Sequence, residues 1–238
     1  MKKGLSDKPV LFLILLLIAS FAVTAVFVII FQTIGMEASL ATSAARILAG
    51  IMLMILFRRC FPWPNSFHGL RVILPALIIV VWNLIYNYLM HAPLKPLADF
   101  PGVVLAALAP AMFEESIFRM IGFQKLEDAG RSPFAAVLTT ALIFGAIHLT
   151  NIVGGDVFNT LIQTCYATAV GILFGGIYVY TKDPASMILL HFLTDFSSQI
   201  FQSSPSPLNV VVVVLFLAVL AFITYYGILL ARKTEAEQ

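Results

Sequence analysis

The chain has 238 residues, of which 61% are hydrophobic and 11% are charged, and its net charge is +2. This apolar fraction excludes a water-soluble enzyme or binding module and predicts an integral membrane protein. The small net charge excludes a strongly basic surface of the kind that binds nucleic acid.

Apolar segments long enough to cross about 30 Å of hydrocarbon as helices recur along the whole sequence. There are eight of them: residues 10–31, 38–57, 70–89, 101–124, 133–150, 157–180, 185–201 and 208–231. The fifth and the seventh are the shortest. The pattern predicts an all-α fold of about eight transmembrane helices in one bundle, formed by residues 1–238 as a single domain.

Lysine and arginine are distributed unevenly between the two ends of these segments. With the N-terminus in the cytoplasm, most of them fall on the cytoplasmic side and only Lys95 falls outside. The cytoplasmic set comprises Arg58, Arg59, Arg71, Lys125, Arg131, Lys182, Arg232 and Lys233. Cytoplasmic loops of membrane proteins are enriched in these residues, so we predict that both termini are cytoplasmic.

Several polar and small residues within the predicted helices indicate packing. Arg46 either pairs with an acidic group or extends to the membrane surface, and we favour the second interpretation. Asn83 and Asn87 share a helix face, where they indicate interhelical hydrogen bonding or, alternatively, a polar path for substrate. Gly171 and Gly175 have the spacing that lets two helix backbones approach closely.

The fourth predicted helix places three ionisable side chains within six residues: Glu114, Glu115 and Arg119. Each costs about 2.5 to 3.5 kcal/mol at the membrane centre, so the cluster needs partners or a function. Glu115 and Arg119 share one face, where a buried ion pair would neutralise both. Glu114 points about 100° away, which leaves it free to act as a general base. Pro110 frees the carbonyl of Ala106 and permits a kink before the cluster.

Two later helices each bring a histidine into the membrane. Phe144 and His148 share a face of the fifth predicted helix, and His191 and Asp195 share a face of the seventh. A single buried histidine is more often a hydrogen-bonded core residue than a catalytic group. Two histidines, several carboxylates and an arginine on three helices supply the base, the polarising partner and the charge stabilisation that water activation requires.

The motifs Glu-Glu-x-x-x-Arg, Phe-x-x-x-His and His-x-x-x-Asp, in this order on successive hydrophobic helices, resemble the CPBP family of intramembrane proteases. That family includes the type II CAAX prenyl endopeptidases and the bacterial Abi, or bacteriocin-immunity, proteins. The resemblance extends over residues 101–201. It implies an endopeptidase that hydrolyses a peptide bond in a lipidated or hydrophobic peptide or a membrane protein. The small chain looks more like a bacterial member, so we expect it in the inner membrane.

The resemblance also implies roles for individual residues. Glu114 would activate the hydrolytic water, His148 would hold that water or a metal ion and complete proton transfer, and His191 and Asp195 would stabilise the oxyanion. The supporting residues would be Glu115, Arg119 and Phe144. The family usually has asparagine where this chain has Asp195, and an ionised aspartate cannot donate a hydrogen bond. For Asp195 the alternatives are therefore to orient His191 or to contribute to a metal site.

Two alternatives are open for the activation of water, and the first is a catalytic zinc ion held by His148 and His191. The sequence lacks His-Glu-x-x-His, so these ligands would have to converge from different helices. The second alternative is that a glutamate and a histidine activate water without metal. Helix geometry raises a difficulty for both alternatives, because it predicts different membrane depths for the two histidines. His148 lies about 22 Å from the cytoplasmic start of its helix, and His191 lies about 9 Å from the start of its own.

The leading hypothesis is peptide hydrolysis in the cytoplasmic-facing half of the membrane. A transporter or proton relay is an alternative, because buried carboxylates and histidines also form relays, although the sequence has no repeat symmetry. A third possibility is a non-catalytic immunity or scaffold protein that keeps the motifs for packing.

Overall fold

A computed structural model describes residues 8–60, 69–202 and 210–237 of the chain, and within them the regular structure is helical. The α-helices are α1 (Pro9–Thr33), α2 (Ala38–Leu56), α3 (Leu70–Ile73), α4 (Ile78–Leu89), α5 (Phe100–Glu115), α6 (Phe123–Asp128), α7 (Pro133–Ile147), α8 (Val157–Thr181), α9 (Pro184–Gln199) and α10 (Val210–Ala236). Short segments extend or join them: η2 (Arg58–Cys60), η3 (Pro75–Leu77), η4 (Leu97–Asp99), η5 (Ser116–Gly122) and η6 (His148–Val153). The continuous pieces make eight helical rods, which confirms the predicted all-α fold class.

Seven rods in the described part of the chain are long and apolar enough to cross a membrane. The exception is α9, which matches the predicted segment 185–201 but has only 16 residues. At about 1.5 Å per residue it reaches about 24 Å, short of the hydrocarbon thickness. The fourth rod is longer than predicted, because η4, α5, η5 and α6 run together over Leu97–Asp128. The predicted start of the last segment, Leu208, lies outside the described residues.

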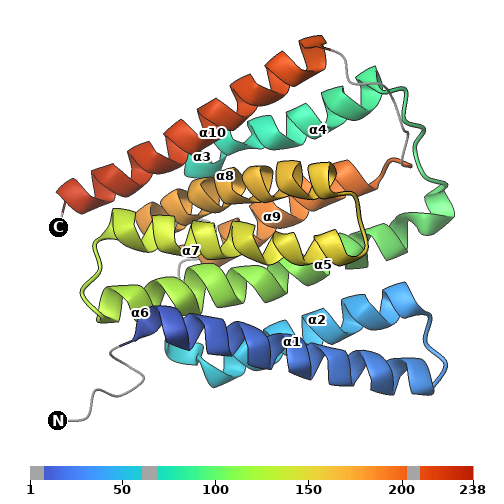
Figure 1. Ribbon diagram of the computed structural model, residues 1–238, viewed down its shortest axis with the longest axis horizontal. Coiled ribbons are helices and arrows are strands. Elements are labelled where there is room, and N and C mark those ends of the chain that lie inside the picture. The colour runs from blue at the N-terminus through green and yellow to red at the C-terminus, as the bar shows by residue number, and fades with distance from the viewer. Residues whose placement is uncertain (1–7, 61–68, 203–209, 238) are drawn as a thin grey trace.

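The rods lie side by side along the long axis of the molecule, and the start of α1 and the end of α10 lie at the same end of the bundle (Figure 1). The α1–α2 hairpin forms one edge of the bundle, and α10 with α4 forms the other. Between them, α8 packs against α7 and α10, while α5 packs against α2 and α9. The turns after α1, α4 and α7 all lie at the end away from the termini.

Hydrogen bonds between helices hold α9 in place. The side-chain amide of Asn83 on α4 donates to the carbonyl of Thr194 at 2.9 Å and to the hydroxyl of Ser197 at 3.0 Å. This confirms the predicted interhelical role of Asn83. Asn87 instead donates to the carbonyl of Asn83 within its own helix.

Glycines on two faces of α8 let it approach both neighbours. A Cβ atom at Gly171 or Gly175 would lie 3.0 Å from the nearest atom of Ala141 or Val137 on α7, so the predicted close approach is confirmed. A second contact was not predicted. Gly176 on α8 and Gly227 on α10 bring the two backbones together, and a Cβ at either would meet backbone atoms of the other helix.

Replacing Gly176 with alanine is therefore expected to destabilise the protein by about 1 to 3 kcal/mol, because backbone atoms cannot move aside as a flexible side chain can. Thermal unfolding in detergent micelles measures this effect. Gly102→Ala is the matched control, since a Cβ there meets no atom within 4 Å. Equal stability of the two variants would contradict a close α8–α10 contact.

Candidate active site

The acidic pair lies where the fourth rod changes its helical geometry. Glu115 is the last residue of α5, and the next seven residues form the π-helix η5. All residues of η5 are buried. Pro110 lies inside α5 without ending it, and both Pro110 and Ala106 line a cavity in front of Glu114. Short π-helical stretches frequently occur at functional sites, where they change the direction in which side chains point.

Glu115 and Arg119 form the ion pair that their spacing predicts. Arg119 Nη1 donates to Glu115 Oε1 at 3.0 Å, and the two side chains are 1% and 0% exposed. The guanidinium carbon also lies 4.6 Å from the centre of the Phe144 ring and 5.3 Å from that of Phe174. Aromatic faces stabilise a desolvated cation. Phe144, predicted only as a supporting residue of His148, therefore also contacts Arg119.

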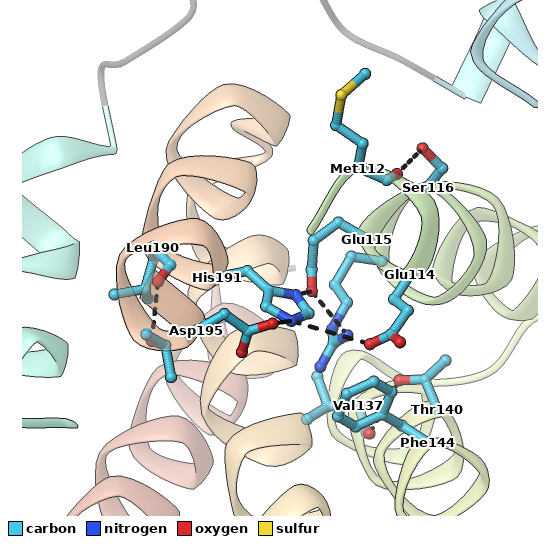
Figure 2. A network of polar contacts seen from close by, with 12 residues as sticks. Met112, Glu114, Glu115, Ser116, Val137, Thr140, Phe144, Leu190, His191 and Asp195 are labelled. Carbon is cyan, nitrogen blue, oxygen red and sulfur yellow. Dashed lines mark hydrogen bonds and ion pairs between the residues drawn. The ribbon is translucent and has the colours of Figure 1, made fainter. Parts of the chain in front are cut away.

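The same carboxylate oxygen of Glu115 binds His191 on α9. His191 Nδ1 lies 2.7 Å from Glu115 Oε1, and the imidazole is buried. Figure 2 shows the His191 ring between Asp195 on its own helix and the two glutamates of the fourth rod. An ionised carboxylate accepts hydrogen bonds, so Nδ1 is the donor and Nε2 faces the other way. Arg119, Glu115 and His191 thus form one continuous polar chain across two helices.

His191 Nε2 faces two further carboxylates. Glu114 Oε2 lies 3.9 Å away and Asp195 Oδ2 lies 3.8 Å away. Both distances exceed a direct hydrogen bond, yet each can be bridged by one water molecule. The hydrogen bond that orients His191 comes from Glu115 and not from Asp195, for which this role was one of the alternatives.

His148 lies at the junction of α7 and η6. Its Nδ1 lies 2.8 Å from the carbonyl oxygen of Phe144, and the two rings are 5.1 Å apart in an edge-on arrangement. Because a carbonyl is only an acceptor, Nδ1 donates and Nε2 is left to accept a hydrogen bond. Within the described residues His148 has no direct hydrogen bond to Glu114 or His191, so a proton transfer between them would have to pass through water or substrate.

These groups line one cavity of about 430 Å³. Its lining includes Glu114, His148, His191 and Asp195, so the two histidines meet at one site despite their different depths along their helices. Part of the lining is apolar, contributed by α1, α7 and α8: Phe21, Ile147, Ala167, Val170 and Phe174. The site therefore combines polar groups that suit water activation with a surface that suits an apolar side chain or lipid.

The cavity has a polar mouth formed by Thr150, Asn151 and Gln163, which are all exposed. The Asn151 amide donates to the Gln163 side chain at 2.9 Å across this mouth. These residues lie between the end of α7 and the first turns of α8, at the end of the bundle away from both termini (Figure 1). The predicted orientation, with both termini in the cytoplasm, would place this mouth on the opposite side of the membrane. The prediction of cytoplasmic termini and the prediction of action in the cytoplasmic-facing half therefore do not agree with each other.

Arg46 also lines the cavity, although the sequence pattern did not indicate that it belongs to the site. The favoured interpretation was an arginine that extends to the membrane surface, whereas the structure places the side chain half-buried in the lining of the cavity that also contains Asp195. Its position near the middle of an apolar segment was the available signal. The alternative interpretation, that Arg46 pairs with an acidic group, could not be preferred from the sequence, because the sequence does not show which helix packs against α2.

The side chains as placed do not fit a zinc site. Within the described residues, no three His, Cys, Asp or Glu side chains gather closely enough to hold a metal ion. His148 and His191 each use Nδ1 for a protein hydrogen bond, and their Nε2 atoms are not brought together with a carboxylate in such a group.

A comparison with protein families gives one match, to a model described as "Type II CAAX prenyl endopeptidase Rce1-like", over residues 96–197. The matched segment runs from the turn before α5 into α9 and carries all seven residues of the three motifs, whereas Arg46 lies outside it. Comparisons with curated proteins and with solved structures gave no match.

Proposed function

Because residues 96–197 match the model of Rce1-like type II CAAX prenyl endopeptidases, we propose that this protein is an intramembrane endopeptidase of the CPBP family in which Glu114 activates the hydrolytic water. The observation that carries the proposal is the convergence of Glu114 and Asp195 on the free Nε2 of His191 inside the cavity. The family consists of proteases, so the substrate contains a peptide bond. The apolar lining favours a lipidated or hydrophobic peptide.

In this proposal, a water molecule binds between Glu114 and His191. Glu114 takes a proton from the water as the water oxygen bonds to the carbonyl carbon of the peptide. The tetrahedral intermediate then collapses, the C–N bond breaks, and the proton passes from Glu114 to the leaving amine. His148, whose Nε2 is free, is placed to hold the substrate or assist this proton transfer.

Glu115 and Arg119 have a positioning role in this mechanism. Glu115 fixes the orientation and tautomer of His191, and Arg119 holds Glu115 by donating to the same carboxylate oxygen. The two neighbouring glutamates thus have different tasks, because Glu115 is held by Arg119 and His191 while Glu114 faces the cavity. A carboxylate that holds a histidine in this way is a recurrent device in hydrolases.

We further propose that substrate enters through the polar mouth, from the side of the membrane opposite the termini. On the other side of the site, η5 contributes fully buried apolar side chains on both sides of Arg119: Ile117, Phe118, Met120 and Ile121.

The experiment that tests the function compares new protein termini and membrane-associated peptides from cells that carry wild type or Glu114→Gln at matched levels. We expect cleavage products only with wild type, at sites within the membrane or on its non-cytoplasmic side. No difference between the two, with the variant still restoring the null phenotype, would favour a non-catalytic immunity or scaffold protein instead.

A further inference from the structure

The cavity contains a cation that the proposed mechanism leaves without a task. Arg46 on α2 is half-buried and lines the cavity together with Glu114 and Asp195. Within the described residues, its guanidinium has no hydrogen bond or ion pair. A guanidinium in an apolar helix is costly unless it interacts with an anion. The free donors of Arg46 are therefore available to a ligand.

The packing of α2 holds Arg46 near the reacting groups. Gly50, one helical turn later on the same face, lies so close to α5 that a Cβ there would be 3.3 Å from the backbone of Met112 and Phe113. These residues directly precede Glu114. The i, i+4 spacing of Arg46 and Gly50 places the arginine on the face that contacts α5, one turn towards the polar mouth.

The charges around the cavity create a need for this cation. Glu114 and Asp195 both line it, and when Glu114 takes the proton of the water, negative charge moves from Glu114 to the oxyanion of the tetrahedral intermediate. An ionised Asp195 cannot donate a hydrogen bond to that oxyanion. Among the described lining residues Arg46 is the one with a permanent positive charge, because Arg119 is fully buried behind Phe144 and paired with Glu115.

We propose that Arg46 binds an anionic oxygen of the substrate. The anion is either the oxyanion of the tetrahedral intermediate or a carboxylate of the bound peptide. A guanidinium recognises both through the same charge-assisted hydrogen bonds. This inference rests on the proposed peptidase function and adds a binding residue that lies outside the family-matched segment.

The test uses a quenched-fluorescent peptide built on a cleavage site recovered from the comparison of termini, made once with a C-terminal carboxylate and once as the C-terminal amide. The full-length protein in detergent is assayed as wild type, Arg46→Gln and Arg46→Lys. The control is Arg59→Gln, which removes an exposed arginine outside the cavity. Thermal unfolding of each variant checks that the fold is retained.

If Arg46 stabilises the intermediate, Arg46→Gln lowers kcat by about 10²- to 10³-fold with little change in KM, and equally for both peptides. If it binds a carboxylate, Arg46→Gln raises KM by roughly 10- to 100-fold for the carboxylate peptide only. Arg46→Lys retains part of either effect. If folded Arg46→Gln cleaves both peptides with unchanged kinetics, the proposed role of Arg46 is overturned, but the peptidase function is not. Failure of wild type to cleave either peptide would instead overturn the peptidase function and this inference with it.

Discussion

Replacing Glu114 with glutamine is expected to lower kcat of the purified protein by about 10²- to 10⁴-fold, the usual contribution of a general base. Glutamine has the same shape as glutamate but cannot accept a proton from water. The Glu114 side chain is 15% exposed and lines the cavity, so the neutral amide is tolerated without a buried charge being left unpaired. The measurement is the cleavage rate of a peptide substrate in detergent or proteoliposomes, with thermal unfolding measured in parallel.

Two further variants make this result specific. Glu237→Gln removes a carboxylate that is 59% exposed near the C-terminus, and it is expected to cleave at the wild-type rate. Glu114→Asp keeps the charge but withdraws it by one methylene, so its rate should lie between those of wild type and Glu114→Gln. A folded Glu114→Gln protein with wild-type kcat would contradict the assignment of Glu114 as the base.

The sequence was sufficient for features that depend on local spacing. Apolar segment lengths predict the eight rods, and the four-residue spacing of Glu115 and Arg119 predicts their ion pair. The small-residue spacing on α8 likewise predicts its close approach to α7. Each of these follows from the geometry of a single helix, which the order of residues largely determines.

Contacts between helices were harder to predict from the sequence. Neither the hydrogen bond from His191 to Glu115 nor the position of Arg46 in the cavity could be predicted, because each depends on the rotation and depth of two different helices. The difficulty over the depths of His148 and His191 has the same origin. It disappears because the cavity extends from the bundle centre to the end of α7, so both side chains reach it. The family model that matches residues 96–197 agrees with the family predicted from the motifs.

The largest effect on stability is expected from Arg119→Met. This change leaves the fully buried carboxylate of Glu115 without its cation, and breaking a buried ion pair in this way typically costs about 3 to 5 kcal/mol. Unfolding of the purified protein in mixed micelles with increasing SDS measures the loss. As a control, Lys125→Met breaks an exposed ion pair with Asp128, and such pairs contribute only about 0 to 1 kcal/mol.

The double variant Glu115→Gln with Arg119→Met separates the stability of this pair from its role in the site. It removes both charges, so it is expected to recover most of the stability lost in Arg119→Met. Its cleavage rate should nevertheless stay below that of wild type, because a neutral amide oxygen holds His191 less firmly than a carboxylate at 2.7 Å. A double variant as unstable as Arg119→Met would show that the arginine acts mainly through its packing against Phe144 and Phe174. Full activity in a stable double variant would instead show that the charge of Glu115 is not needed to position His191.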